Sequence, residues 1–221
     1  IISEEFIFPF QNEHVHGSSI EMLPGGDLLA CWFQGSGERS ADDVRIMGAR
    51  FKKGINKWSD PFLMADTKGI PDCNPVLFLN RKNKLFLFWI AVVANKWEDA
   101  IIRYRTSSNY NGSGAPVWEW QDNILLKPDD RFSSEVEKKF KEMPESQAGW
   151  AAYAPLYDNM IVDASKDLLK RSIGWMTRIH PITLQSGRIL LPLYSDGFNF
   201  SMIAISDDDG TSWRNSLPIV G

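Results

Sequence analysis

The sequence of 221 residues predicts an all-β protein assembled from repeated antiparallel sheets. Three segments share one layout: an apolar strand, a Gly or Asn turn, a second apolar strand, and a turn that carries tryptophan. They are "SSIEMLPGGDLLACWF" with "VRIMGARFKKGINKWSDP", "NPVLFLNRKNKLFLFWI" with "AIIRYRTSSNYNGSGAPVWEW", and "HPITLQSGRILLPLY" with "FSMIAISDDDGTSWRNS". Lys84 follows Asp27 by 57 positions and precedes Arg188 by 104, which is roughly two periods of about 50 residues.

A period of about 50 residues with four short strands in each unit predicts the blade of a β-propeller. We therefore expect residues 1–221 to form part of a propeller, with three to four blades of a ring of about six. Because three blades cannot close such a ring, two sheet faces would stay uncovered. The remaining blades are expected from a longer chain or from a second copy.

Extra chain length between the second and third repeats predicts a small helical insertion at residues 130–177. Ser134 and Glu137 form a capping-box pattern, which marks the start of a helix. Apolar residues at helical spacing then mark one face, namely Val136, Phe140 and Met143. The segment "DASKDLLKRSIGW" is a second helical candidate. The insertion either covers one edge of the sheets or forms a wall of the substrate cleft.

Composition and charge argue against several classes of partner. A net charge of −4 without a long basic run disfavours nucleic acid and anionic membranes. No apolar stretch reaches the roughly 18 residues of a membrane span, and "IISEEFIFPF" lacks the basic start of a signal peptide. Neither zinc-ligand spacing nor a P-loop is present, so we expect no metal and no cofactor. Cys31 and Cys73 lie in apolar strands and are expected as buried thiols.

Three consecutive aspartates in "AISDDDGTSWRNS" raise the question of a calcium loop. With Gly210 as the invariant glycine of an EF-hand, position 1 would be Ile205 and position 12 would be Ser216, and neither residue is the required ligand. The same residues predict a tight turn between two strands instead. In it Asp208 bonds to nearby backbone, Gly210 supplies a positive φ, and Trp213 packs on the sheet.

This turn is also part of a family resemblance. "SDDDGTSW" fits the Asp-box pattern Ser-x-Asp-x-Gly-x-Thr-Trp with Ser212 in place of threonine, and "ARFKKGINKWSDP" is a degenerate copy. Together with "LPGGDLLACWFQGSGE", "NPVLF" and "GWMTRIHPITLQSGRILLPLYSDGFNFSMIAISDDDG", it resembles the sialidase-like BNR-repeat family over nearly the whole chain. The resemblance implies a sialidase-type propeller, with the acidic turn as a structural element of the outer rim. It also implies an exo-acting glycoside hydrolase of carbohydrate, in a periplasmic or secreted location.

Propellers bind ligands at the central channel, near the start of each first strand and the end of each second strand. Polar residues of both charges occupy these positions in all three repeats. The candidates for binding substrate are Glu38, Arg45, Asn74, Arg178, His180 and Tyr194, and the candidates for catalysis are His16, Asp42 and Asp43.

The resemblance suggests roles for the catalytic candidates. Sialidases begin their first strand with Arg-Ile-Pro, whose arginine holds the sugar carboxylate, and here His16 stands in that place. This departure argues against sialic acid as the substrate. The acid/base aspartate of sialidases follows the second strand of the first blade, which makes Asp42 or Asp43 the candidate general acid. Their mutual repulsion, with Glu38 nearby, would raise a carboxyl pKa, whereas Arg45 would oppose that shift.

Two other functions fit the same residues. A polysaccharide lyase would use His16, His180 or Tyr194 to remove a proton beside a carboxylate, because imidazole and phenol groups serve as bases. A non-catalytic propeller would bind glycan through the same channel without turnover. The sequence leaves these alternatives open.

Overall fold

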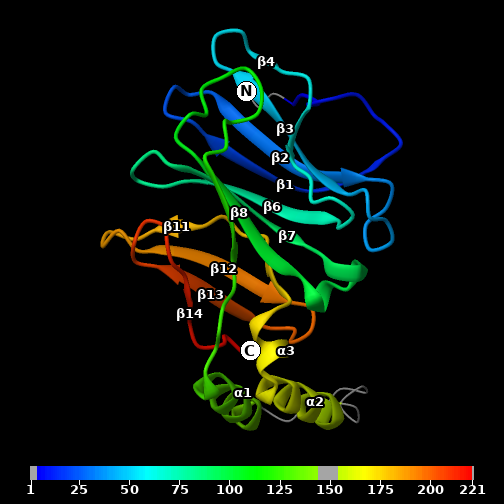
Figure 1. Cartoon of the computed structure of the whole chain (residues 1–221), viewed down its shortest axis with the longest axis vertical. Helices are drawn as coiled ribbons and strands as arrows, with labels where there is room; N and C mark the ends of the chain where they lie inside the picture. The colour runs from blue at the N-terminus through cyan, green and yellow to red at the C-terminus, as the bar shows by residue number, and fades with distance from the viewer. Residues whose placement is uncertain (1–3, 144–153, 221) are drawn as a thin grey trace.

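The computed structural model describes residues 4–143 and 154–220, which form three antiparallel sheets and a group of helices. The sheets are stacked in chain order along the vertical axis of Figure 1, with the N-terminal sheet at the top. Blade 1 holds β1 (His14–Met22), β2 (Leu28–Gly35), β3 (Arg45–Lys52), β4 (Lys57–Trp58) and β5 (Phe62–Ala65). Blade 2 holds β6 (Asp72–Leu79), β7 (Leu85–Ala91), β8 (Ile101–Ser107) and β9 (Trp120–Ile124). Blade 3 holds β10 (Trp175–Thr177), β11 (Ile182–Thr183), β12 (Ile189–Ser195), β13 (Ser201–Ser206) and β14 (Arg214–Asn215).

The three sheets follow the order that the repeats predict, which confirms a propeller-type all-β fold. Blade 2 runs β6-β7-β8-β9, and blades 1 and 3 each add a short fifth strand to the same meander. The first strand of each repeat, β1, β6 or β10, is therefore an edge strand. The three edge strands lie against one another, with β6 in the middle.

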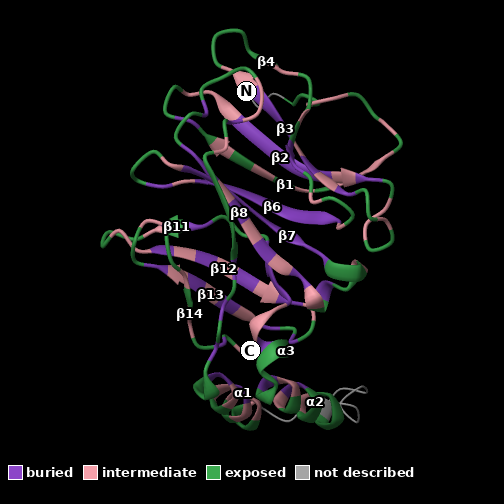
Figure 2. Ribbon diagram, in the orientation of Figure 1, coloured by how far each residue is buried: buried purple, intermediate pink, exposed green. Residues whose placement is uncertain are grey.

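Burial differs between the middle sheet and the outer sheets. Every residue of β7 (LFLFWIA) is buried, because blade 2 packs between two other sheets, and Figure 2 shows it mostly purple. Strand β12 (ILLPLYS) instead alternates between buried and half-buried residues, as expected for a sheet with one covered face. Partly exposed apolar residues such as Leu190 and Ile203 remain on the far side of blade 3.

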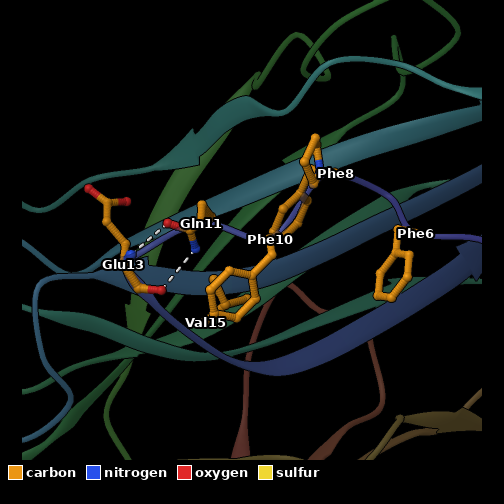
Figure 3. Close-up of a pocket in the computed structure, with 7 residues that line it drawn as sticks. Phe6, Phe8, Phe10, Gln11, Glu13 and Val15 are labelled. Carbon is orange, nitrogen blue, oxygen red and sulfur yellow. Dashed lines mark hydrogen bonds between the residues drawn. The ribbon is translucent and has the colours of Figure 1, made fainter.

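The far face of blade 1 carries the N-terminal segment. Phe8 lies over Trp32 with ring centroids 5.0 Å apart, and together with Val15 it helps to line an open hollow of about 410 Å³ (Figure 3). Phe6 and Phe10, on either side of Phe8, are 85% and 98% exposed. Both outer sheets thus present apolar surface.

The helical insertion is present, with boundaries that differ from those expected. It contains α1 (Asp130–Glu142), α2 (Ala154–Lys166) and α3 (Leu168–Ser172). Helix α1 starts at an N-cap formed by Asp129, whose carboxylate accepts from the backbone of Arg131, so the capping-box prediction at Ser134 and Glu137 was wrong. The hydroxyl of Ser134 bonds inside the helix to the carbonyl of Asp130.

The second helical candidate is divided and ends earlier than predicted. Asp167 separates α2 from α3 and caps α3 by accepting from the backbone N–H groups of Leu169 and Lys170. Gly174 then takes a φ of 75°, which ends the helix, and residues 175–177 form strand β10. The insertion covers the end of blade 3, where Phe132 packs on Trp175, Phe198 and Phe200.

The acidic segment forms the predicted turn, between β13 and β14. The carboxylate of Asp208 accepts from the backbone N–H of Ser212 at 2.8 Å and from the hydroxyl of Ser206 at 2.8 Å. Gly210 has a φ of 87°, and a Cβ there would lie 2.6 Å from the ring of Phe86. Trp213 packs edge-on against Phe88 of blade 2 with centroids 5.6 Å apart. The turn is therefore structural and joins blade 3 to blade 2.

Two other predictions concern the cysteines and membrane spans. Cys31 and Cys73 are free and buried, as predicted, and burial raises the pKa of Cys73 to about 12. None of the helices in the described ranges is long and apolar enough to cross a membrane.

Replacing Asp208 with Ala should destabilise the fold, because it leaves the turn's backbone donors without their charged acceptor. We expect the free energy of unfolding to fall by about 2 kcal/mol or more in urea titrations. Asp209→Asn is the matched control. It removes only the exposed ion pair with Lys82 and keeps a residue that tolerates the φ of 59°, so the change should stay within about 0.5 kcal/mol. Equal losses in the two variants would contradict the structural role of Asp208.

Candidate functional site

Side chains satisfy the free backbone groups where the three edge strands meet. The hydroxyl of Ser19 on β1 accepts from the backbone N–H of Leu77 on β6 at 3.0 Å. Two residues further along, the Glu21 carboxylate accepts from the N–H of Leu79 at 3.1 Å. On the other side of β6, the hydroxyl of Thr177 donates to the Asn74 carbonyl at 2.7 Å. Since β6 bonds to the edge strands β1 and β10 through side chains, the sheets meet there without merging into one.

Each of these edge strands is interrupted at a corresponding position. On β1 the pairing with β2 shifts between His16 and Ser19, and on β6 the pairing with β7 shifts between Cys73 and Val76. In blade 3, the interruption falls between β10 and β11, which pair with the same strand, β12. Such bulges re-aim side chains and are common beside active sites.

Candidate site residues lie at these bulges. Gly17 and Asn74 adopt left-handed φ values of 62° and 49° at the bulges of β1 and β6. A Cβ at Gly17 would lie 2.6 Å from the ring of Phe33, so glycine is required there for both space and φ. Asn74 tolerates the conformation because its short amide side chain suits the left-handed region.

The bulges bring four predicted residues together. The guanidinium of Arg178 lies 3.3 Å from Nε2 of His16, which joins blade 3 to blade 1. The Asn74 amide donates to the Tyr194 hydroxyl at 3.0 Å, which joins blade 2 to blade 3. Burial raises the phenol pKa of Tyr194, and the hydrogen bond from Asn74 and the charge of Arg178 oppose part of that rise. We call His16, Asn74, Arg178 and Tyr194 the mouth cluster.

The amide of Asn74 is the most enclosed part of the mouth cluster. The residue is 1% exposed, and its Oδ1 atom has no hydrogen-bond partner among the described residues. A buried acceptor without a partner is costly, which is characteristic of a functional site rather than of a packed core. Beside it, a hollow of about 190 Å³ is lined in part by Tyr194, Asp196 and Asn199.

Loops from all three blades form a rim next to the mouth cluster. Arg39, on the loop between β2 and β3, pairs with Asp196 of blade 3 at 2.7 Å. The same guanidinium lies 4.1 Å from the ring centroid of Trp97, in the loop after β7. Asp42 accepts from the amide of Asn95 in that loop at 2.7 Å. The β2–β3 loop is thus fastened to both other blades.

Asp43 differs from its neighbour Asp42. Its carboxylate accepts from the backbone N–H and the hydroxyl of Ser36 at 3.0 and 2.9 Å. These bonds hold the pKa of Asp43 below its usual range, with a smaller contribution from Arg45. The raised carboxyl pKa that the acidic cluster suggests does not apply to Asp43, because hydrogen bonds within its own loop outweigh the effect of burial.

Of three further predicted residues, Arg45 and His180 lie apart from the mouth cluster, whereas Glu38 lies near its His16. Arg45 pairs with Glu13 at 3.2 Å, beside the N-terminal segment on the far face of blade 1. His180 pairs with Glu21 at 2.9 Å, and this bond raises its pKa. Glu21 is five residues along β1 from His16, a distance of roughly 15 Å at strand spacing. His180 therefore lies outside the mouth cluster. Glu38 contacts His14 at 3.5 Å, and the ring of His14 lies 5.9 Å from that of His16.

Comparisons with known proteins agree with this architecture. The family model for the BNR repeat-like domain matches residues 26–220. The chain belongs to this BNR repeat-like family. No curated protein sequence matches the chain.

Similar solved structures include sialidases and another glycoside hydrolase, all at low sequence identity. The Hadza microbial sialidase Hz136 superposes with a TM-score of 0.59 at 12% identity, over 93% of this chain and 38% of its own. The leech intramolecular trans-sialidase gives 0.60 at 13% identity, over 98% and 46%. Zg3597, a family 117 glycoside hydrolase from Zobellia galactanivorans, gives 0.58 at 11% identity, over 95% and 58%. The BNR repeat-like chain therefore shares their fold and spans 38% to 58% of their length.

The structure adds residues that sequence reasoning missed. Arg39, Trp97 and Asn95 organise the rim, and Thr177 holds the edge of β6. Arg39 and Asn95 both have a positive φ. Asparagine often adopts this conformation, but arginine rarely does, so the sequence does not predict it at Arg39. The pairing of Arg39 with Asp196 spans 157 positions, so no local pattern reveals it.

A buried carboxyl group two residues before Asn74 gives the domain a testable pH dependence. Asp72 is 0% exposed and accepts from the indole of Trp89 at 2.8 Å and from the backbone N–H of Thr67 at 2.6 Å. Burial raises its pKa to about 6, from an ordinary value of 3.8. The folded state therefore holds this proton more tightly than the unfolded chain does.

The contribution of Asp72 to the free energy of unfolding should be fully present below pH about 4. It should be lost as the pH rises through about 6, and the total loss should be at most about 3 kcal/mol. Asp72→Asn, which has no proton to lose, should flatten that part of the curve in urea unfolding measured between pH 4 and 8. Asp60→Asn, at an exposed carboxylate, should leave the curve unchanged. An unaltered pH profile in Asp72→Asn would contradict the assignment.

Proposed function

We propose that the protein is a glycoside hydrolase of the sialidase-like type, acting on a glycan that carries an anionic sugar. The mouth cluster carries this proposal, because it gathers a guanidinium, an imidazole, an amide and a phenol from three blades. Polar groups that converge from three blades suit the recognition of a hydroxyl-rich ring. We further propose that it acts outside the cytoplasm.

Asp42 is the proposed general acid. Its side chain is exposed on the rim and bonded only to Asn95 among the described residues, so it can approach a glycosidic oxygen. Asp43 is committed to Ser36 and is proposed to keep the loop in shape. His16 and Arg178, at 3.3 Å, are proposed to bind the sugar, with Arg178 attracting its negative charge.

The proposal requires more blades than the three described. The exposed faces of blades 1 and 3 and the partial coverage of known structures support a ring completed by further chain or by a second copy. The nucleophile is then expected from those blades. Tests of activity accordingly use the full-length protein.

Loss of the proposed acid should depend on the leaving group. In Asp42→Asn, turnover of a natural glycan should fall by about 10²-fold or more, because the departing oxygen no longer receives a proton. An activated nitrophenyl glycoside needs no such proton and should lose much less. His16→Ala should slow both substrates alike.

Asp43→Asn and Asp60→Asn are the matched controls for that experiment. Asp43→Asn should act through loop stability and slow both substrates to a similar, smaller extent, and Asp60→Asn should have no effect. Equal losses on both substrates in Asp42→Asn would exclude the acid role. Glycan binding without turnover by the wild-type protein would favour a binding module instead.

A lyase is the second candidate, favoured by the position of Tyr194 between Asn74 and Arg178. Near a uronate, Arg178 would hold the carboxylate while Tyr194 or His16 removed the adjacent proton. Burial, however, raises the pKa of Tyr194, which opposes its use as a base at neutral pH.

Reaction in water enriched in heavy oxygen separates the two chemistries. A hydrolase adds water across the cleaved bond, so we expect mass spectrometry to find heavy oxygen in the new reducing end. A lyase eliminates the leaving group without adding water and forms an unsaturated uronate that absorbs ultraviolet light. An unsaturated product without incorporated oxygen would replace the hydrolase proposal by the lyase.

A further inference from the structure

A cavity of about 400 Å³ lies between the helical insertion and the blade loops, outside the mouth cluster. Helices α2 and α3 form one side, and η2 (Trp97–Asp99) and the β12–β13 loop form the other. In Figure 1 helices α2 and α3 lie at the lower end of the molecule. Ser195 and Gly197 line the cavity, whereas Asp196 between them pairs with Arg39 on the rim. The cavity and the mouth are therefore neighbours that share one loop.

Specific contacts hold the walls of this cavity in place. The backbone N–H of Gly174 donates to the carbonyl of Ala100 at 2.9 Å, which ties the end of α3 to blade 2. A Cβ at Gly174 would lie 2.2 Å from the carbonyl oxygen of Glu98, so only glycine permits this approach. On the opposite side, the amide of Asn199 donates to the Tyr157 hydroxyl of α2. Hydrogen bonds between the surrounding elements therefore fix the position of the cavity walls.

The lining combines apolar walls with unpaired negative charge. Met160, Ala164 and Phe198 contribute apolar surface. The carboxylates of Glu98 and Asp99 have no hydrogen bond or ion pair among the described residues. The third acid in the lining, Asp167, is already used to cap α3. Lys170 is the single basic residue of the lining in the part of the chain that the structure describes, so negative charge predominates.

We infer that this cavity is a binding pocket for a small apolar molecule, or apolar group, that carries a positively charged amine. The volume falls within the range of small-molecule sites, and the walls would bury a ring or short alkyl chain. Glu98 is exposed and Asp99 half-buried at one side of the cavity, where their negative charge would attract the ammonium group. The inference does not depend on the proposed glycan chemistry.

Three probes of similar size and different charge test this inference. Phenethylammonium, phenethyl alcohol and phenylpropanoate share an aromatic ring and a short chain. Titration calorimetry with the full-length protein should show the ammonium binding about tenfold or more tighter than the alcohol, the equivalent of about 1.4 kcal/mol, and the carboxylate binding weakest. In the double variant Glu98→Gln with Asp99→Asn, this preference should disappear while binding of the alcohol stays.

Two variants that fill the pocket and one control complete the experiment. Ala164→Phe should abolish binding of all three probes. Leu169→Trp should do the same at the entrance, where the native side chain is 65% exposed and a larger one need not disturb the fold. Asp163→Asn removes an acid of α2 that is 77% exposed and paired with Lys166, and it should change nothing.

Several results would overturn the inference. The first is that none of the three probes binds. The second is that the ammonium and the carboxylate bind equally well. The third is that a folded Leu169→Trp variant binds the ammonium as tightly as the unaltered protein does. Because none of these measurements uses glycan turnover, a failed pocket and a failed hydrolase proposal are distinguishable. A protein without glycosidase activity that still prefers the ammonium would retain the pocket.

Discussion

The structure depends on how the edge strand β6 satisfies its free backbone groups. Were β1 to pair with β6 through backbone bonds, blades 1 and 2 would become one continuous sheet. Instead the side chains of Ser19 and Glu21 accept from N–H groups of β6. The hydroxyl of Thr177 donates to the β6 carbonyl at Asn74. These side-chain bonds satisfy the buried polar backbone and leave each sheet separate. A stack of separate sheets around their first strands is the arrangement of a propeller.

The bulges in the same strands turn this architecture into a candidate site. A regular strand would alternate its side chains between the two faces of its own sheet. The interruptions after His16 and at Asn74 break that alternation, and the break between β10 and β11 places Arg178 outside the ladder. The side chains at these positions thereby meet those of neighbouring blades. Left-handed φ values at Gly17 and Asn74 are the local cost, and both residue types tolerate them.

Features governed by local sequence were predictable, and those governed by distant contacts were not. The repeats, the three meanders and the turn around Asp208 follow from apolar alternation and turn residues within short windows. The predicted helix start was wrong because Asp129, five residues before Ser134, forms the N-cap and accepts from the backbone of Arg131. Arg45 and His180 lie outside the mouth cluster because their partners, Glu13 and Glu21, lie on other segments, which no local pattern reveals. The lowered pKa of Asp43 could not be predicted because the hydroxyl and backbone donors of Ser36 reach it only in the folded loop.

The central claim is that residues on the first strands of different blades form one glycan site. A crystal structure of the full-length protein with a bound oligosaccharide tests it most directly. We expect a sugar ring in contact with His16 of blade 1 and with Arg178 and Tyr194 of blade 3, and near the rim that Asp42 occupies. A sugar bound on the outer strands, or at the far end of β1 beside His180, with the mouth cluster unoccupied, would contradict the claim.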